Sequence, residues 1–450
     1  MIGNVIIASA FLAVVFGQYN QPSPTYSQTK VVCYYDTKGN FRSGNAKFED
    51  SYLQEPLQFC THLIYGFAGI NPTTYKAIPL SEQFDVIQNH YREITNLKRR
   101  FPGLKVLLSF GGDRDDPEHR EKYLKLLESV DTRLSFIDSA ENLVSLYGFD
   151  GIDLAWQFPR NKPKKIHDTW GAIWSKVKHT FVSPSEIDPK HEEHNTQFTA
   201  LVRELKNTFA HKGLLVSMSV LPNINSSIFH DVPKLVPNLD FINLWAFDYY
   251  TPERNPKEAD YTSPLHELIN RKFDENGNYL VQYWLHKGCP NNKLIYGIPT
   301  FGRSWKMSKD SGLSGVPPID HIKGAGEAGI HTKEEGLLSY EEVCVLLSNP
   351  QHLQNSLRKV GDPTGKYANE WIRSDVTNRY GTYAFKLPDK SGHGGMWVAY
   401  EDPLTAENKA SYARSKGLGG IAIVDLTLDD FRGTCSGNKY PILRAARLRL

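Results

Sequence analysis

One short apolar run, Phe149–Pro159, contains the side chains whose types and spacing could perform acid–base chemistry. It is rich in branched and aromatic residues and ends at a proline, which predicts a buried strand with a polar end. Because side chains alternate along a strand, Asp153, Ala155 and Gln157 are expected to share one face. One interpretation is a catalytic site. The alternative is a core strand whose polar groups only form structural hydrogen bonds.

Eight segments with β-branched or aromatic character predict the strands that must position this run. They are Lys30–Asp36, Thr61–Gly69, Leu104–Gly111, Gly148–Trp156, Leu214–Leu221, Leu239–Phe247, Leu294–Phe301 and Gly419–Asp425. Amphipathic helical patterns lie between them, one with apolar residues at Phe84, Ile87, Tyr91, Ile94 and Leu97. Strand and helix alternating in this way favour an α/β protein with a closed (β/α)8 barrel over an open doubly wound sheet. Functional residues of such barrels lie at the carboxyl ends of the strands.

Two long spans interrupt the alternation. The span Phe158–Asn195 follows the fourth predicted strand and contains the basic run Arg160–Lys165. That run is either a solvated face or part of a functional rim loop. The second span, 304–394, is long enough to form an α+β subdomain inserted between the seventh and eighth strands. The predicted barrel therefore comprises residues 30–303 and 395–450.

The first residues predict export from the cell. An apolar run from Val5 to Phe16 is followed by Gly17 and polar residues, which is typical of a signal peptide over residues 1–17. The run is shorter than the roughly 20 residues that span a bilayer, so no membrane insertion is expected. Residues 18–29 are predicted to be a disordered lead-in. The formal net charge of +2 gives no reason to expect a nucleic-acid partner.

Secretion would permit disulfides between the cysteines. Cys33 lies in the first predicted strand and Cys60 just before the second, so neighbouring strands would bring them together. Cys344 and Cys435 are the next plausible pair, which leaves Cys289 as a free thiol. The spacing fits no zinc pattern, and neither a metal nor a cofactor is expected. Asn225-Ser226-Ser227 is a sequon for N-glycosylation.

Four ordered motifs resemble the family 18 chitinases. They are Leu107–Gly112, Phe149–Leu154, Gly297–Arg303 and the closing segment from Gly419-Gly420 to Asp429-Asp430-Phe431. The resemblance extends from Val31 to about Cys435. It implies a (β/α)8 barrel with an α+β insertion after the seventh strand, which agrees with the pattern of strands and helices.

The chain departs from that family at the residues that carry its chemistry. The active fourth-strand pattern Asp-Gly-x-Asp-x-Asp-x-Glu begins at Asp150, but Ala155 replaces the aspartate that orients the substrate and Gln157 replaces the acidic glutamate. Phe247 stands where the family has a tyrosine before the retained Asp248, and Val424 stands where it has a stacking tryptophan. Glutamine cannot act as a general acid. We therefore expect no catalytic residue, and we expect Asp150, Asp153 and Asp248 to form structural hydrogen bonds.

Within the family, the run through Gln157-Phe158-Pro159 and the following Asn161–Lys165 resemble the imaginal disc growth factors, secreted chitinase-like proteins of arthropods. That resemblance implies a glycosylated extracellular monomer that promotes cell proliferation, polarisation and motility. Its implied partners are a cell-surface receptor or components of insulin-like peptide signalling. A lectin that binds chitooligosaccharides without cutting them is the alternative.

Overall fold

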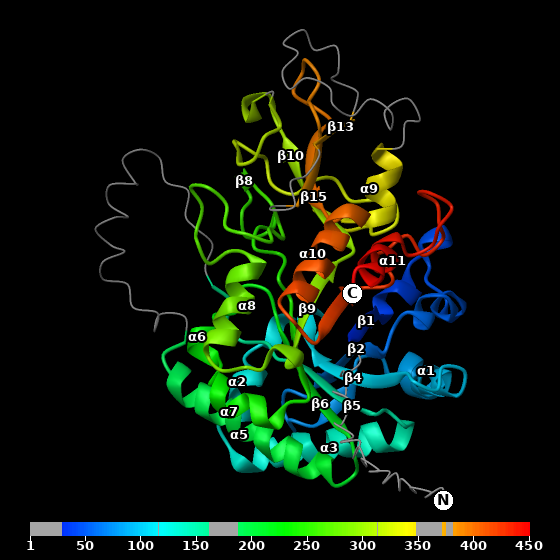
Figure 1. Ribbon diagram of the computed structural model, residues 1–450, viewed down its shortest axis with the longest axis vertical. Coiled ribbons are helices and arrows are strands. Elements are labelled where there is room, and N and C mark those ends of the chain that lie inside the picture. The colour runs from blue at the N-terminus through cyan, green and yellow to red at the C-terminus, as the bar shows by residue number, and fades with distance from the viewer. Residues whose placement is uncertain (1–28, 116, 162–187, 313, 348–370, 375–380) are drawn as a thin grey trace, which may run out of the picture.

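Eight parallel strands close into a barrel (Figure 1). The structure is a computed structural model that describes residues 29–115, 117–161, 188–312, 314–347, 371–374 and 381–450. The barrel strands are β1 Lys30–Asp36, β2 His62–Ile70, β4 Lys105–Gly111, β5 Gly151–Ala155, β6 Leu215–Val220, β7 Phe241–Leu244, β9 Leu294–Pro299 and β16 Gly420–Val424. All eight predicted strands and the predicted α/β barrel are confirmed.

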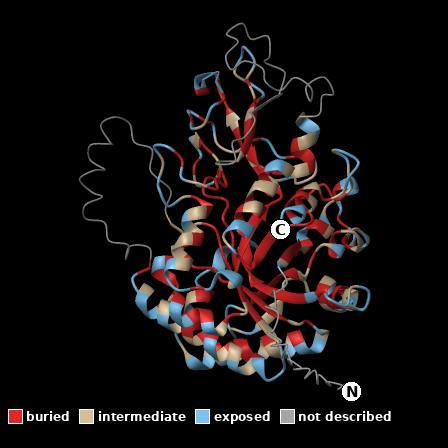
Figure 2. Ribbon diagram, viewed as in Figure 1, coloured by how far each residue is buried: buried red, intermediate tan, exposed pale blue. Residues whose placement is uncertain are grey.

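The first and last strands pair with each other and close the barrel. In register, Cys33 of β1 faces Leu63 of β2 on one side and Ile423 of β16 on the other. The strands consist mainly of buried branched and aromatic residues, as parallel strands covered on both faces require. Figure 2 shows these buried strands at the centre and exposed residues on the outer helices.

Helices cover the outside of the barrel (Figure 1). They are α1 His90–Thr95, α2 Lys122–Leu127, α3 Val130–Tyr147, α5 His191–Ala210, α6 Ser226–Phe229, α7 Val232–Leu235, α8 Gly277–His286, α10 Pro403–Ser415 and α11 Pro441–Leu448. The helical pattern from Phe84 to Leu97 is not one helix. A π-helical turn, Glu82–Ile87, ends before α1 because Asn89 adopts a left-handed conformation with φ 63°. Ile87 is consequently exposed.

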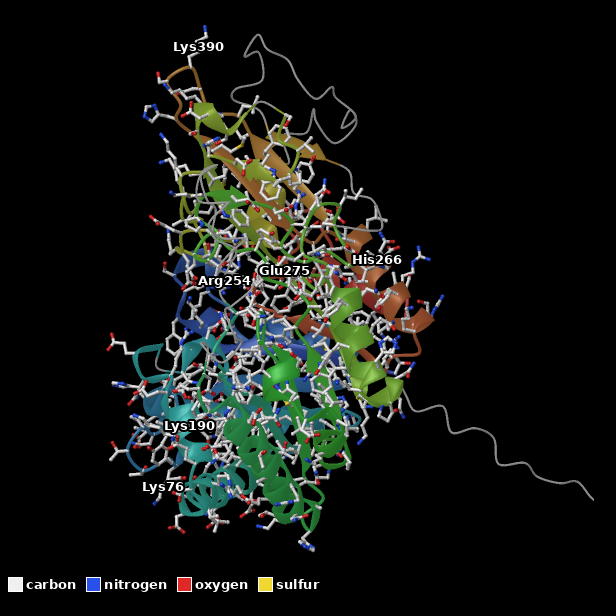
Figure 3. The ribbon with its side chains drawn as sticks, turned by 90° about the vertical axis from the view of Figure 1, so that its left-hand side faces the viewer. Lys76, Lys190, Arg254, His266, Glu275 and Lys390 are labelled. Atoms are coloured by element: carbon white, nitrogen blue, oxygen red, sulfur yellow. A yellow bond between two sulfur atoms is a disulfide. The ribbon has the colours of Figure 1, made fainter. Side chains whose placement is uncertain are left out.

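The span between β9 and β16 builds a second sheet, together with helix α9 Tyr340–Leu347. Its five antiparallel strands, in spatial order, are β12 Leu337–Ser339, β10 Phe301–Met307, β15 Gly395–Tyr400, β14 Thr382–Lys386 and β13 Trp371–Ser374. The sequence-based boundary at 394 is wrong, because β15 pairs with β10 and β14. Lys390, between β14 and β15, lies at the outer tip of this inserted sheet, far from Lys76 and Lys190 (Figure 3).

Two very short pairings complete the sheet structure. Strand β3 Ala77–Pro79 runs antiparallel to β2 at the edge of the barrel. Strand β8 Glu258–Ala259, which follows β7, pairs with β11 Ile319–Asp320 of the insertion. The β8–β11 pairing is one of the contacts that hold the inserted subdomain against the barrel.

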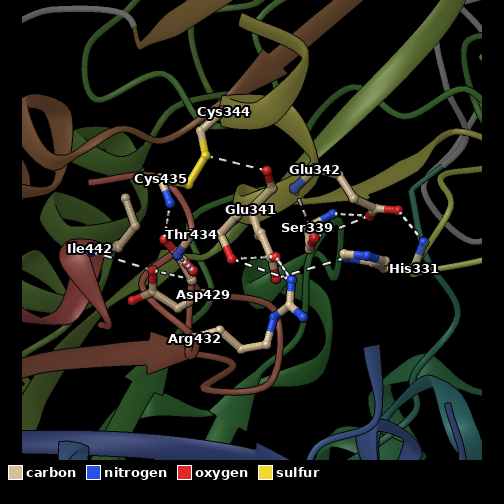
Figure 4. The surroundings of a disulfide bond; sticks show 11 residues. His331, Ser339, Glu341, Glu342, Cys344, Asp429, Arg432, Thr434, Cys435 and Ile442 are labelled. Carbon is tan, nitrogen blue, oxygen red and sulfur yellow. Dashed lines mark hydrogen bonds and ion pairs between the residues drawn. A yellow bond between two sulfur atoms is a disulfide. The ribbon is translucent and has the colours of Figure 1, made fainter. Parts of the chain in front are cut away.

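Both predicted disulfides are present. Cys33–Cys60 lies within the barrel, and Cys344–Cys435 joins α9 to the segment after β16. Beside the second disulfide, Arg432 forms an ion pair with Glu341 of α9 (Figure 4). Cys289 is buried and free, as predicted, and burial raises the pKa of its thiol to about 12.

Several predicted segments lie outside the described residues. These are the signal peptide, nearly all of the lead-in, most of the span Phe158–Asn195 and part of the insertion. In the part of the chain that the structure describes, no helix is long and apolar enough to cross a membrane.

Candidate functional site: the mouth of the barrel

A cavity of about 250 Å³ opens at the carboxyl ends of the barrel strands. Its wall combines charged side chains with six aromatic rings, those of Tyr34, Tyr35, Phe67, Trp245, Phe247 and Phe301. Four of the rings are in contact, since Trp245 lies edge-on to Tyr34 at 5.2 Å between centroids and stacks with Phe247 at 5.4 Å, and Phe247 in turn contacts Phe301. This is the position at which barrels of this class carry their functional residues.

Two glycines at the end of β4 bring the chain close to β5. Gly111 has a φ of 107°, and a Cβ atom there would lie 2.3 Å from the carbonyl oxygen of Ala155. Gly112 has a φ of 63°, and its Cβ would meet the ring of Phe67 at 2.7 Å. Only glycine fits both the conformation and the space. The Ser-Phe-Gly-Gly motif therefore places the loop after β4 directly against the end of β5.

Asp153 lies in the centre of the barrel, beneath the cavity, and is fully buried. Its carboxylate accepts hydrogen bonds from Ser109 on β4 at 2.9 Å and from Ser217 and Ser219 on β6 at 2.7 and 2.8 Å. Asn243 on β7 donates a fourth, at 3.2 Å. Burial raises the pKa of Asp153, while these donors lower it. The carboxylate thus links four strands, which is the structural role that the sequence suggested.

Gln157 does not point into the central cavity. Strand β5 ends at Ala155, so the alternation expected from the sequence does not continue to residue 157. The side chain is 6% exposed, and its Nε2 donates to the carbonyl oxygens of Gly112 and Asp115, the latter at 3.2 Å. Gln157 lines a separate cavity of about 310 Å³ that also contains Arg160. In this chain the side chain at position 157 therefore packs against the loop after β4.

The other sequence-predicted residues divide between the cavity and places away from it. Phe247, Asp248 and Val424 line the cavity. Asp150 precedes β5 and lies at the opposite end of the strand, where it accepts a hydrogen bond from the backbone N–H of Val106 at 2.8 Å and pairs with Lys98 at 3.0 Å. Ala155 is buried and is not part of the cavity wall.

Ion pairs occupy most of the charged side chains around the mouth. Asp248 binds Arg303 of β10 through two hydrogen bonds of 2.8 and 2.7 Å, and Arg114 binds Asp36 at 2.6 Å. Lys38, after β1, pairs at 2.6 Å with Glu334 of the insertion. Asp113 pairs with Arg160. These pairs bind the insertion and the rim loops to one another across the cavity.

Asp425 is one of the cavity residues that the sequence analysis missed. It directly follows β16, is 7% exposed and lines the cavity beside Val424. Burial, together with the nearby charge of Asp36, raises the pKa of its carboxyl to about 7, while Arg42 acts in the opposite direction. The signal was present in the sequence, because an acidic residue at the carboxyl end of a barrel strand is a candidate functional residue. The resemblance to the family 18 chitinases singled out only the neighbouring Val424.

The arrangement favours binding over hydrolysis. A glycosidase general acid must reach the leaving oxygen, and the side chain at position 157 is an amide directed at two backbone carbonyls. The cavity instead offers aromatic surface, fixed ion pairs and the buried carboxyl group of Asp425. The described residues contain no group of three or more histidine, cysteine, aspartate or glutamate side chains that could hold a metal ion.

Comparison with known proteins matches residues 30–429 to the family described as Glycosyl hydrolases family 18. The chain is 49% identical over 453 residues to the chitinase-like protein Idgf4 of Glossina morsitans morsitans, covering 99% of each chain. It is 45% identical over 436 residues to imaginal disk growth factor 6 of Drosophila melanogaster, covering 95% of each.

Among solved structures, the chain resembles catalytic domain 2 of the Ostrinia furnacalis group II chitinase, with a TM-score of 0.74 at 29% identity over 94% of this chain and 96% of that one. It also resembles human YKL-39, described as a pseudo-chitinase with retained chitooligosaccharide binding, with a TM-score of 0.71 at 28% identity over 94% and 99%. The chain therefore belongs to glycosyl hydrolase family 18 and, within it, to the chitinase-like Idgf proteins.

Proposed function

We propose that this chain is a secreted, non-enzymatic growth factor that promotes cell proliferation, polarisation and motility together with insulin-like peptides. It acts as a monomer through protein contacts, with a cell-surface receptor or insulin-like peptide signalling components as partners. The name of the Drosophila relative, imaginal disk growth factor 6, supports the assignment to growth-factor signalling.

The observation that carries the non-enzymatic part is the geometry of Gln157. Its amide has no proton that titrates near neutral pH, and its Nε2 is already committed to Gly112 and Asp115. Ala155 supplies no second carboxylate. Purified protein should therefore release no product from a fluorogenic chitooligosaccharide beyond that of a Gln157→Ala variant. Turnover above this control would contradict the assignment.

The signalling surface is proposed to include the span that begins at Phe158. The structure shows how that span is anchored: the backbone N–H of Asn161 donates to the carbonyl oxygen of Asn223 at 2.7 Å, and Arg254 donates to the carbonyl oxygen of Asn161 at 2.9 Å. Arg254 lies at mid-height in Figure 3. At the other end, Asp188 accepts from His194 of α5 at 2.7 Å.

The test is therefore an excision limited to residues 162–187, replaced by a short glycine–serine linker, which leaves both anchors in place. Added to cultured insect cells with insulin, the intact protein should stimulate proliferation and the excised form should not. The thermal unfolding temperature of the two forms should agree within a few degrees. Equal stimulation by the excised form would rule out this surface.

A chitooligosaccharide lectin is the second candidate. The aromatic lining of the mouth favours it, since sugar rings pack on aromatic faces, and the solved human relative is described as retaining chitooligosaccharide binding. The sequence argued against a stacked sugar from the loss of tryptophan at Val424, but Trp245 contributes an aromatic ring to the same wall. Calorimetry with chitooligosaccharides tests this function, and the absence of binding heat at millimolar ligand would exclude chitooligosaccharide binding.

If the protein is secreted, we also expect an N-linked glycan on Asn225. This side chain lies at the N-terminus of α6, where its Oδ1 accepts hydrogen bonds from the backbone N–H and the hydroxyl of Ser227 at 3.0 and 2.6 Å. Protein secreted from insect cells should lose mass on treatment with a glycosidase that cleaves N-linked glycans. A Ser227→Ala variant should be secreted without that mass.

A further inference from the structure

Two charged side chains in the cavity wall, Asp425 and Arg42, belong to none of the ion pairs described above. Asp425 uses Oδ1 to accept hydrogen bonds from the backbone N–H and the hydroxyl of Thr427, at 2.6 and 2.7 Å. Among the described residues, none donates a hydrogen bond to its second oxygen, Oδ2. Asp425 nevertheless lies in the cavity wall and is more than nine-tenths buried. A buried carboxylate of this kind is costly unless a partner arrives.

The neighbouring charges do not supply that partner. The guanidinium of Arg42 donates to the carbonyl oxygen of Thr427 at 2.6 Å and to its hydroxyl at 3.2 Å. Arg114 is bound to Asp36, and the carboxylate of Asp36 repels that of Asp425. Burial and this repulsion raise the pKa of Asp425 to about 7. A cation placed in the cavity would relieve both effects.

The aromatic side of the cavity suits the same ligand. The faces of Trp, Tyr and Phe rings attract cations, most strongly where water is excluded. Phe247 lies edge-on to Phe301 at 5.8 Å and stacks with Trp245, so these rings form a continuous wall. Arg303 already lies over the ring of Phe301, at 4.8 Å from its centroid. A cavity of about 250 Å³ admits a compact ligand.

We propose that the mouth of the barrel binds a primary ammonium group, with Asp425 Oδ2 accepting its hydrogen bond and the aromatic wall covering its carbon body. The ammonium group comes either from an amino sugar that lacks an acetyl group or from a lysine side chain. This site goes beyond the growth-factor function proposed above and does not depend on it. It also differs from a lectin site for chitooligosaccharides, whose amino groups are acetylated and uncharged.

Two matched pairs of probes test the ligand class by calorimetry on the full protein. The first pair is glucosamine and N-acetylglucosamine, and the second is Nα-acetyl-lysine amide and its Nε-acetylated form. Each amine should bind about 10- to 100-fold more tightly than its acetylated partner, as expected for a charge-assisted hydrogen bond. The amine that binds identifies the source. If neither amine binds better than its acetylated partner, the proposal is overturned.

A matched pair of variants tests the residue. Asp425→Asn should abolish the preference for the amine, whereas Asp429→Asn should keep it. Asp429 is an apt control because it is also buried with a pKa raised to about 7, but its carboxylate accepts from the backbone N–H groups of Asp430 and Leu443, at 2.8 and 3.2 Å, outside the cavity. Unchanged preference in Asp425→Asn would contradict the proposal.

The unmodified protein provides an independent check that needs no variant. The ligand must displace the proton of Asp425, so affinity for the lysine probe should rise about tenfold per pH unit from pH 5 to pH 7 and level off above. The lysine ammonium itself remains charged over this range. Affinity that does not change between pH 5 and pH 8 would overturn the assignment to Asp425.

Discussion

At the scale of single residues, the side chain of Gln157 contributes to packing and not to acid–base chemistry. Gln157 fills its site as a hydrogen-bond donor to two backbone carbonyls, a role that a carboxylate cannot take. The sequence alone shows that position 157 carries an amide and not an acid. The direction of the side chain was not predictable, because it depends on where β5 ends and on the loop that Gly111 and Gly112 bring close.

Gln157→Glu should therefore destabilise the protein without restoring hydrolysis. At neutral pH a carboxylate would face the carbonyl oxygens of Gly112 and Asp115, and we expect a loss of about 1–3 kcal/mol in the free energy of unfolding. The loss should shrink towards pH 4, where the new carboxyl can be protonated and donate. Urea unfolding at both pH values, with a chitooligosaccharide assay, measures this. A gain of turnover would show that the side chain can reach the mouth.

Asp425→Asn should stabilise the protein at neutral and higher pH. The folded pKa of about 7 lies above the ordinary value of about 3.9, so the folded state holds the proton more tightly and stability is lost as pH rises from about 4 to about 7. Asparagine removes this dependence while still accepting from Thr427. The variant should gain up to about 4 kcal/mol relative to the native chain at pH 8 and little at pH 4. Asp310→Asn, at an exposed aspartate, should show no such trend.

At the scale of elements, the sequence predicted the strands of the barrel but not the contacts around its mouth. Short apolar segments at regular spacing specify strands by local pattern alone, which is why all eight were found. The break at Asn89 and the assignment of β15 to the inserted sheet depend on a left-handed residue and on pairing with distant strands. The ion pairs across the mouth join residues as far apart in sequence as Lys38 and Glu334, which no local pattern reveals.

The loop before α9 depends on one buried carboxylate. Glu342 accepts from the backbone N–H groups of His331 and Ser339 at 2.6 and 2.8 Å (Figure 4). It also accepts from the backbone N–H of Thr332 at 3.1 Å. Replacing it by alanine removes the acceptor of these buried and partly buried donors, which should cost about 2–4 kcal/mol in the free energy of unfolding.

Hydrogen exchange measures the local effect of Glu342→Ala. The amides of residues 331–339 should exchange faster in the variant, because their acceptor is gone. Glu335→Ala, at an exposed position in the same loop, is the control and should exchange like the native protein. If both variants show the same protection, the carboxylate does not organise this loop.

At the scale of the whole molecule, a covalent bond and an ion pair attach the insertion to the end of the barrel. Cys344–Cys435 closes a loop of 91 residues, whereas Cys33–Cys60 closes one of 27. Chain entropy then gives upper limits of about 5 and about 4 kcal/mol for their contributions. Replacing Cys344 and Cys435 by serine should therefore reduce stability more than replacing Cys33 and Cys60. Urea unfolding without reductant compares them, and a larger loss from the Cys33–Cys60 pair would contradict the estimate.

Cys289 offers a probe of the intact fold. Its thiol is buried and its pKa is raised to about 12, so the reactive thiolate is scarce at neutral pH. A thiol reagent should label the native protein very slowly and the urea-unfolded, unreduced protein rapidly. Rapid labelling under native conditions would mean that the region around Cys289 opens.

The pairing of β1 with β16 also determines when the protein can fold during its synthesis. The backbone groups of Lys30–Cys33 cannot pair with Gly420–Ile423 until the ribosome has added those residues, hundreds of positions later. Until then one edge of a largely apolar sheet stays open, and an open edge can pair with other chains. The incomplete chain is therefore exposed to aggregation for most of its translation, and destabilising the last strand should reduce the yield of folded protein more than its equilibrium effect alone would suggest.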